Sequence, residues 1–548
     1  KLNADAGSVT LTNGSNALTE ISGRAYGTGN FALNNSNTST LTIGTVDGVA
    51  GLENGGTGFV QVQTGGPLAQ TQRVLAPTFK STSTDGVTLN SNINQIAAFE
   101  ISNTAGDIII KNSVNTTLTS IVNNDSSPMP PARYIQVDNA GSVTVGSVTT
   151  QSAETGLTFA TAAVGIKSVQ GISSSGGGTH VSATNGGSVY LEAGSSSVGA
   201  SSANRVRIDS TGPIVVAAAG AGQQANLGLL AATVNLNKVN AASHVDIVGD
   251  GTNALTVTDI TSTSGNVQLA SLGSALVTGK VQATAGSVSV AAANNITIQP
   301  AAGNTADAEI NAGVSANIAS TSGSVNLLAS ATRGARLIGT SGGAAPGCAT
   351  DAVCITTGGA GAVNLTAMGA NSAGISSAAG AISINSGSLV LTAGTTGDAL
   401  VQTGGAIGTL PATCTNCNLL PFGSTPISNG IAQAGLLASN RYLKVIAGPD
   451  SATVPAAGST VNLLANDSVD TMNGSLSSAP ATPALVNITL VSPPPVVTML
   501  GGTSVDVPAS TPAGSYSFSY TSCAVADANN CVTGTISLNK SAPAPAPT

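Results

Sequence analysis

Along most of this chain, a glycine is followed by two apolar residues that alternate with small polar ones. The stretch 284–300, TAGSVSVAAANNITIQP, has this pattern, with Val288 and Val290 following Gly286. An alternation of period two places both apolar side chains on one face of a β-strand. We therefore predict a short strand in which the two valines are buried and Ser289 faces outward.

The motif Gly-x-Φ-x-Φ, in which Φ is apolar, recurs at intervals near one or two units of roughly 20 residues, which indicates a solenoid. Its copies begin at Gly7, Gly106, Gly141, Gly187, Gly212, Gly265, Gly286, Gly323, Gly361 and Gly380. Two apolar residues cannot form a core alone, so we predict that each unit coils once and stacks on its neighbour as a parallel β-helix. Each buried Val or Ile would then contribute about 1.5–3 kcal/mol. An array of β-sandwiches is the alternative, because its strands alternate too.

The β-helix interpretation fixes which side chains point inward and what the corners contain. Glycine and asparagine should occupy the corners, because a positive φ is often required there. A narrow interior should leave little room for large rings, and only 2% of the residues are aromatic. Further inward positions are expected at Val325, Leu327, Ile382 and Ile384, and further outward ones at Asn326 and Ser383.

Composition excludes several classes of protein. Charged residues make up 7% of the chain and the net charge is −8. Without a basic cluster there is no counterion release to drive nucleic-acid binding. The apolar run 213–222 is among the longest and is too short to span a membrane. The strand pattern begins close to Lys1, so we expect no signal peptide in this sequence and a targeting segment that has been removed.

The six cysteines form three close pairs, which predict the disulfides Cys348–Cys354, Cys414–Cys417 and Cys523–Cys531. Local pairing of every cysteine favours an oxidising, extracellular location. Six buried free thiols are one alternative, and a zinc site built from the first four cysteines is another. The spacing at 414–417 also fits a redox CxxC motif, but the surrounding pattern is not the βαβ unit typical of such proteins.

The units AGSVSVAAANNITI, SGSVNLLASA and NGGSVYLEAG resemble the repeats of filamentous-haemagglutinin-type exoproteins, which are secreted right-handed β-helices of Gram-negative bacteria. The resemblance covers roughly residues 1–410 and implies an all-β fold with a right-handed parallel β-helix over 1–413. Adhesins, toxin stalks and surface fibres share such repeats. The sequence lacks a recognisable N-terminal secretion cap of that family, which leaves the export route open.

The Gly-x-Φ-x-Φ repeat is no longer recognisable after about residue 410, and the sequence pattern changes there and again near residue 444. We predict a cap and connector over 414–443, with a short helix near 431–437. From Lys444 the segments 445–468 and 510–538 resemble bacterial Ig-like or cadherin-like surface domains, so the resemblance implies an Ig-like β-sandwich over 444–540. The Pro/Ala-rich end 541–548 should be a polyproline-like tail.

The sequence offers little for catalysis. An enzyme of this fold would be a polysaccharide lyase or hydrolase, which needs paired carboxylates or acidic calcium ligands. The 24 acidic residues are scattered singly, and we interpret the loose group Asp246, Asp250 and Asp259 as solvated turn residues. His180 and His244 are interpreted as exposed loop residues. We therefore predict no enzymatic activity, no cofactor and no dedicated metal site.

One weak metal candidate follows from the resemblance. Asp450, Asn466 and Asp467 lie where related domains often hold calcium between modules, although Asn and Asp are equally expected in turns. Calcium at these residues is therefore an open alternative to an ordinary turn.

These observations favour a non-enzymatic structural protein of the bacterial surface. The first hypothesis is a fibre subunit that associates head to tail, with the C-terminal domain of one copy on the first rungs of the next. Such a heterologous contact does not close on itself and gives a filament. The alternatives are a monomeric adhesin that contacts cell-surface proteins or glycans, and a polysaccharide-degrading enzyme.

Overall fold

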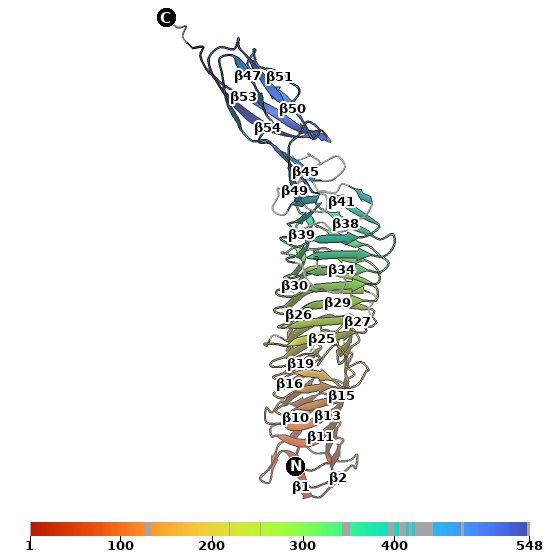
Figure 1. The fold of residues 1–548 in the computed structure, drawn as a ribbon. Coiled ribbons are helices and arrows are strands. Elements are labelled where there is room, and N and C mark those ends of the chain that lie inside the picture. The colour runs from red at the N-terminus through yellow and green to blue at the C-terminus, as the bar shows by residue number, and fades with distance from the viewer. Residues whose placement is uncertain are drawn as a thin grey trace. The chain divides into compact units, whose positions relative to one another are not determined.

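The structure, a computed structural model, is all-β. It describes residues 2–125, 133–218, 220–251, 254–341, 351–392, 399–404, 413–415, 419–421, 442–472, 476–525 and 527–544, and these residues form strands and turns without any helix (Figure 1). None of them forms a helix that could cross a lipid bilayer. The chain divides into two compact units, residues 1–301 with 308–323 and residues 302–307 with 324–548.

The first unit is built from short strands. Their bounds are β1 (Leu2–Ala6), β2 (Val9–Leu11), β3 (Glu20–Ala25), β4 (Phe31–Asn35), β5 (Leu41–Ile43), β6 (Thr45–Val46), β7 (Val49–Ala50), β8 (Leu52–Asn54), β9 (Phe59–Thr64), β10 (Leu68–Gln70), β11 (Val74–Ser83), β12 (Val87–Leu89), β13 (Gln95–Asn103), β14 (Ile108–Asn112), β15 (Thr116–Asn123), β16 (Ile135–Asn139), β17 (Val143–Val145), β18 (Val148–Thr150), β19 (Val164–Ser168), β20 (Ile172–Ser174), β21 (Val181–Ala183), β22 (Val189–Ala193), β23 (Val206–Ser210), β24 (Pro213–Ala218), β25 (Gln224–Leu229), β26 (Thr233–Ala241), β27 (His244–Gly249), β28 (Ala254–Ser262), β29 (Val267–Ser271), β30 (Ser274–Ala283), β31 (Val288–Ala292), β32 (Ile296–Ile298), β33 (Ala308–Ala312) and β34 (Ala316–Ser320).

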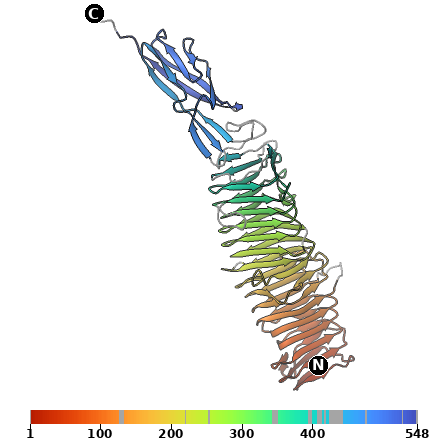
Figure 2. The same cartoon turned by 45° about the vertical axis from the view of Figure 1, so that its right-hand side comes forward.

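Apart from β6 and β7, which form an antiparallel pair of their own, these strands pair in parallel with strands one coil further along the chain. In β26, β28 and β30, for example, Leu236 lies opposite Val257, which lies opposite Val277. Figures 1 and 2 show the strands of this unit lying in successive layers. A long parallel sheet in which like residues stack is compatible with the predicted β-helix and does not fit an array of sandwiches, whose sheets are antiparallel.

The interior follows the predicted alternation. Val288 and Val290 are at most 1% exposed, while Ser289 between them is half-buried. The same alternation holds in the second unit, where Val325, Leu327, Ile382 and Ile384 are buried and Asn326 and Ser383 are half-buried. The period-two assignment of these strands is confirmed.

The interior also admits aromatic rings, which the sequence did not lead us to expect. Phe31, Phe79 and Phe99 are fully buried on neighbouring rungs, with Val60 between the first two. Phe79 lies directly opposite Phe99, with ring centroids 6.4 Å apart in an edge-to-face arrangement. At this level the interior is therefore wide enough for a column of rings.

The repeat glycines are needed mainly for close approach between rungs, and not for the positive φ that we predicted. Gly106 has a φ of 78°, but Gly265 and Gly286 do not lie in that region. A Cβ on Gly286 would lie 2.2 Å from the carbonyl oxygen of Gly265, and one on Gly265 would lie 1.5 Å from that of Ser243. The expectation was wrong for these corners because the backbone of the preceding rung leaves no room for a side chain.

Serine completes many of the corners. The hydroxyls of Ser83, Ser168 and Ser262 each donate to the carbonyl oxygen three residues later, at 2.8–3.0 Å. All three serines are buried. Because a buried carbonyl without a partner is costly, this bond lets the chain turn while its backbone remains satisfied.

Charged side chains on the outer surface form columns of alternating sign. Lys111, Asp138, Lys167 and Glu192 lie opposite one another on four successive paired strands. A second column contains Lys238, Asp259, Lys280 and Glu309. Opposite charges that face each other across paired strands stabilise the pairing, whereas like charges destabilise it. If a strand paired with the next strand but one, two residues of the same charge, such as Lys111 and Lys167, would face each other. The alternating columns therefore favour the observed order of pairing.

In the second unit, parallel strands precede antiparallel sheets. The strands are β35 (Val325–Leu328), β36 (Ala335–Gly339), β37 (Val353–Thr357), β38 (Ala362–Thr366), β39 (Ala373–Ser377), β40 (Ile382–Asn385), β41 (Ser388–Thr392), β42 (Ala399–Thr403), β43 (Thr413–Thr415), β44 (Leu419–Pro421), β45 (Tyr442–Ile446), β46 (Asp450–Val454), β47 (Gly458–Asn462), β48 (Ser468–Met472), β49 (Leu476–Pro480), β50 (Val486–Val491), β51 (Thr498–Leu500), β52 (Ser504–Pro508), β53 (Gly514–Ala524) and β54 (Asp527–Lys540).

The C-terminal strands form three small sheets, β45-β48-β49, β46-β54-β53-β50 and β47-β52-β51. They share one apolar cluster that includes Val454, Leu463, Val505, Phe518 and Ile536. Pairing in these sheets is antiparallel except between β46 and β54. This segment therefore has its own core. The helix predicted near 431–437 lies outside the described residues.

Replacement of Gly286 by alanine should destabilise the first unit strongly, by about 1–3 kcal/mol, because the added methyl overlaps the Gly265 backbone. Gly178→Ala is the matched control, since a Cβ there meets nothing within 4 Å. Chemical denaturation of the two full-length variants measures the difference. Equal stability of both variants would contradict the close-approach explanation.

Candidate functional site

The three predicted calcium ligands do not behave alike in the structure. Asp450 begins β46, and Asp467 lies just before β48; both are buried, with 8% and 3% of their surfaces exposed. Asn466 is exposed, and its side-chain amide donates to the carbonyl oxygen of Pro449 at 2.9 Å. The structure thus groups the two aspartates in the interior and leaves Asn466 as a clamp on the neighbouring loop.

Sequence reasoning missed the residue at the centre of this group. Tyr520 of β53 is fully buried, and its hydroxyl lies 3.2 Å from both carboxylate oxygens of Asp467. The carbonyl oxygens of Gly448 and Leu463 lie 3.3 and 3.4 Å from the same hydroxyl. In the sequence, Tyr516, Phe518 and Tyr520 alternate, which predicts that they share one face of a strand. No local signal links Tyr520 to an aspartate more than fifty residues earlier.

The acid–tyrosine cluster, meaning Asp450, Asp467 and Tyr520, contains more acceptors than donors. One hydroxyl proton cannot serve all of the oxygens around it. The backbone N–H of Gly448 donates to Asp467 Oδ1 at 2.8 Å, but Oδ2 of Asp450 is buried without any hydrogen-bond partner. A buried carboxylate oxygen in this state is costly, so the cluster has a physical reason to take up a proton or a cation.

The pKa values of the cluster reflect the same imbalance. Burial raises the pKa of Asp450 to about 6; the hydrogen bond from Tyr520 lowers it, and the charge of Asp467 raises it further. Burial also raises the pKa of Asp467, against the hydrogen bonds from Gly448 and Tyr520. Burial and the two carboxylates raise the pKa of Tyr520 well above its usual range, so its hydroxyl stays protonated.

A hard cation such as calcium prefers carboxylate and carbonyl oxygens, and both kinds converge here. Asp450, Asp467 and the carbonyl oxygens of Gly448 and Leu463 would be the ligands. Within the described residues, however, no group of three or more His, Cys, Asp or Glu side chains could hold a metal ion. Calcium at this cluster stays a prediction, with Asn466 outside the set.

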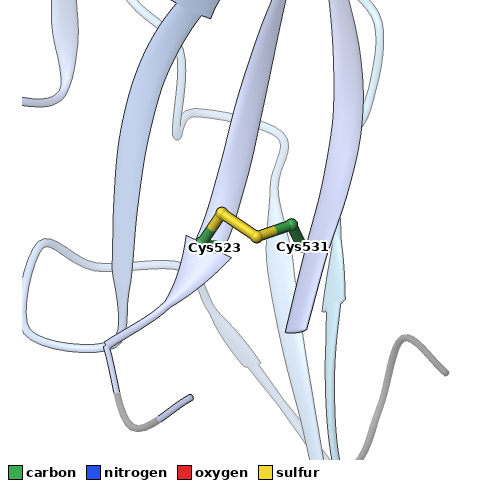
Figure 3. The surroundings of a disulfide bond; sticks show 2 residues. All are labelled: Cys523 and Cys531. Carbon is green, nitrogen blue, oxygen red and sulfur yellow. A yellow bond between two sulfur atoms is a disulfide. The ribbon is translucent and has the colours of Figure 1, made fainter. Parts of the chain in front are cut away.

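Two strands of the cluster's sheet are joined by a disulfide. Cys523 of β53 and Cys531 of β54 lie directly opposite each other and are bonded at 2.02 Å (Figure 3). This predicted pair is confirmed. The pairings 348–354 and 414–417 stay predictions, because Cys348, Cys417 and the side chain of Cys414 lie outside the described residues; Cys354 is buried in β37.

The acids that we interpreted as solvated turn residues are partly structural, and that interpretation was wrong for two of the three. Asp246 is 4% exposed within β27 and forms an ion pair with Arg205 at 2.5 Å. Asp259 lies in β28 as a member of the second charged column. Asp250, which follows β27, lies 3.5 Å from Arg207. These carboxylates join rungs.

The histidines were also misassigned as exposed loop residues. His180 is 1% exposed; its Nδ1 accepts the backbone N–H of Arg207 at 2.9 Å, and Nε2 lies 3.3 Å from the carbonyl oxygen of Gly176. Burial lowers the pKa of His180, and the charge of Arg207 lowers it further, against the hydrogen bonds that the ring makes to the backbone of Gly176 and Ser175. A neutral imidazole here pins the loop to the next rung. His244 begins β27 and is half-buried.

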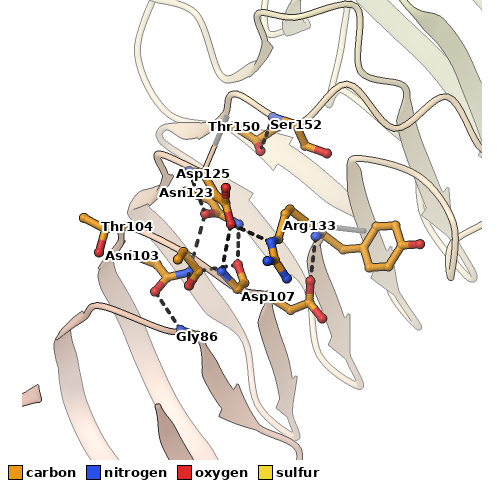
Figure 4. A network of polar contacts seen from close by, with 12 residues as sticks. Gly86, Asn103, Thr104, Asp107, Asn123, Asp125, Arg133, Thr150 and Ser152 are labelled. Atoms are coloured by element: carbon orange, nitrogen blue, oxygen red, sulfur yellow. Dashed lines mark hydrogen bonds and ion pairs between the residues drawn. The ribbon is translucent and has the colours of Figure 1, made fainter. Parts of the chain in front are cut away.

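A buried polar network occupies one corner of the first unit (Figure 4). Asn103 and Asn123 lie opposite each other, and their amides donate to the carbonyl oxygen of Gly106 at 2.9 and 3.0 Å. Asp125 Oδ2 accepts the N–H of Gly106 at 3.0 Å and pairs with Arg133 at 2.5 Å. The asparagine amides and Asp125 satisfy backbone groups at the turn, and Arg133 neutralises Asp125, so this network supports the fold.

Comparison with protein-family models, curated proteins and solved structures finds no match to this chain. Its own residues are therefore the basis for any functional assignment.

The unfolding temperature of the C-terminal sheets should rise as the pH falls from 7.5 to 5. The folded state takes up a proton on Asp450 near pH 6, whereas an unfolded aspartate does so near 3.9, so protonation favours folding until the pH falls below the unfolded value. Asp450→Asn should weaken this slope and stabilise the sheets at pH 7.5, by about 1–2 kcal/mol. Calorimetry of the full chain measures both effects.

Asp506→Asn on β52 is the matched control, because Asp506 is half-buried in the same segment and takes no part in the cluster. An unchanged slope in Asp450→Asn would contradict the role assigned to Asp450.

A calcium ion at the cluster would compete with this proton. If calcium binds, millimolar calcium chloride at pH 7.5 should raise the unfolding temperature of the full chain and leave that of Asp450→Asn unchanged. Magnesium chloride at equal ionic strength is the control for screening. If calcium raises the unfolding temperatures of the wild type and of Asp450→Asn equally, the prediction of calcium at this cluster is wrong.

Proposed function

We propose that this chain is a non-enzymatic structural protein of the bacterial cell surface, a right-handed parallel β-helix followed by an Ig-like β-sandwich. The resemblance of its repeats to filamentous-haemagglutinin-type exoproteins supports the first fold, as does the parallel in-register pairing. The shared apolar cluster of the C-terminal sheets supports the second. The disulfide Cys523–Cys531 supports an extracellular location, where such bonds persist.

Within that class, self-association into a fibre is the function that the geometry supports best. The observation that carries it is the compensation of charge along the columns, such as Lys238, Asp259, Lys280 and Glu309. A surface whose charges cancel from rung to rung presents little repulsion to a further stacked chain. A stack of parallel strands also exposes unpaired N–H and C=O groups on its terminal strands, which template further pairing unless they are covered.

The placement of the ion pairs also supports a structural role over an enzymatic one. Lys80 with Glu100 and Lys167 with Glu192 join paired strands, and Arg336 of β36 pairs with Asp307 just before β33, all at 2.8–3.0 Å. Asp246 and Asp125 also form ion pairs, with Arg205 and Arg133 respectively. In this proposal the few charged residues hold register, and the head-to-tail contact is made by the C-terminal sheets of one copy on the first strands of the next.

The fibre proposal predicts concentration-dependent filaments from the full chain, and none after deletion of residues 444–548. Negative-stain electron microscopy and sedimentation measure the assembly, and circular dichroism checks that the shortened chain keeps its strands. Deletion of 541–548 alone is the control that separates the sheets from the tail.

Filaments of normal length from the 444–548 deletion would overturn the head-to-tail mechanism. Isolated particles from the full chain at every concentration would overturn the fibre itself and favour a monomeric adhesin.

A further inference from the structure

A shallow hollow of about 250 Å³ lies on the outer face of β9, β11, β13 and β15 in the first unit. Its polar lining comes from two adjacent columns of outward side chains. One contains Gln61, Lys80, Glu100 and Ser120, and the other contains Thr82 and Ser102. The hollow is thus built from four successive strands and not from a flexible loop.

A β-bulge interrupts the regular ladder at this place. Leu118 lies opposite Phe99, but the next pair joins Glu100 to Ser120, so Thr119 is an extra residue on β15. An extra residue bends its strand and redirects the side chains beside it. The interruption adjoins Glu100, one of the two charged groups in the hollow.

The charges in the hollow cancel. Lys80 and Glu100 form an ion pair at 2.8 Å, and each side chain remains more than a third exposed. Lys80 Nζ also lies 5.4 Å from the ring centroid of Phe59, at the start of β9. A ligand would therefore meet an ammonium and a carboxylate with no net charge between them, and the ring of Phe59 lies under the ammonium, outside the lining of the hollow.

The neutral polar side chains of the hollow have no partners within the protein. Among the described residues, the side chains of Gln61, Thr82, Ser102 and Ser120 make no hydrogen bond to another protein group. Together they present an amide and three hydroxyls beside the ion pair, which supplies both donors and acceptors. These groups are available to a ligand once the water that covers them is displaced.

The ion pair Lys167–Glu192 provides an internal comparison. Its lysine and glutamate also face each other on adjacent strands, at 3.0 Å. There, however, the hydroxyl of Tyr190 donates to Glu192 at 2.7 Å, and Phe159 packs edge to face against Tyr190. The carboxylate is thus engaged by its own protein, whereas Glu100 has only its lysine.

We propose that the hollow binds one ring of a neutral glycan. Adjacent hydroxyls of a sugar ring match the pair, because one donates to Glu100 while its neighbour accepts from Lys80. Gln61 and the three hydroxyl side chains bond further ring substituents. Because Lys80 is already neutralised, a sulfated or phosphorylated ligand gains no net attraction. The site is independent of filament formation.

A site of this size and openness should bind one ring weakly, with a dissociation constant on the order of 1 mM, and a dense glycan surface more tightly. The experiment applies the full chain to an array of immobilised neutral hexose and N-acetylhexosamine oligosaccharides, with sulfated glycans on the same array. Saturation-transfer NMR with the retained oligosaccharide then reports contact in solution.

Glu100→Gln and Ser102→Tyr should each reduce retention of the neutral glycan at least tenfold. The first replaces the charged acceptor by a weaker neutral amide and breaks the ion pair that positions Lys80, and the second fills the hollow. Glu192→Gln is the matched control for loss of a ladder carboxylate. Ser537→Tyr is the matched control for filling, because it lies in a second hollow, lined only by uncharged residues such as Ser451 and Ser517. Both controls should bind as the wild type does.

Circular dichroism and the unfolding midpoint verify that each variant is folded. If Ser102→Tyr does not fold, Glu100→Gln alone tests the glycan site, because it keeps the shape of the side chain. Retention that is lost in Ser537→Tyr and kept in Glu100→Gln would overturn the proposal. Absence of any retained neutral glycan, or retention of sulfated glycans alone, would overturn it as well.

Discussion

The structure depends on how closely one rung of backbone lies on the next at the corners. A Cβ on Gly265 or Gly286 would fall within 1.5–2.2 Å of a carbonyl oxygen of the preceding coil. This distance leaves glycine as the residue that allows the strands on either side to pair without a gap. The recurrence of glycine, which is visible in the sequence, is therefore a consequence of stacking. The conformational freedom that glycine also offers is used at fewer corners, such as Gly106.

Because the coils stack in register, local sequence predicted a great deal of the fold. The positions of Val288, Val325 and Ile382 follow from alternation alone, since a residue in a strand can face only one of two sides. Contacts between coils do not follow from it. The pairing of Lys280 with Glu309 depends on how many residues each turn consumes, and that number varies along the chain. The burial of Asp246 and His180 could not be predicted for the same reason, because it depends on which residues of the neighbouring coils lie beside them.

The acid–tyrosine cluster marks the limit of sequence reasoning for the candidate site. The resemblance to calcium-holding domains points to Asp450 and Asp467, but their burial arises from sheets that assemble segments far apart in the chain. Tyr520 reaches them because β53 belongs to the same sheet as β46, with β54 between the two strands. An alternating aromatic pattern predicts a strand and its buried face. It does not predict which polar group of another segment will contact the buried tyrosine.

In a repetitive fold, regular rungs are interchangeable, so a specific function requires a place where regularity fails. The alternating charges and the repeated corners of the first unit are sufficiently explained by register and backbone satisfaction. The bulge beside Glu100 costs a ladder position, as do the register shifts beside Lys238 and Asp259, so a bulge alone does not mark a site. Next to it stand an ion pair and hydroxyls that the protein does not use itself. An irregularity that coincides with unused polar groups is better explained by a ligand than by the requirements of stacking.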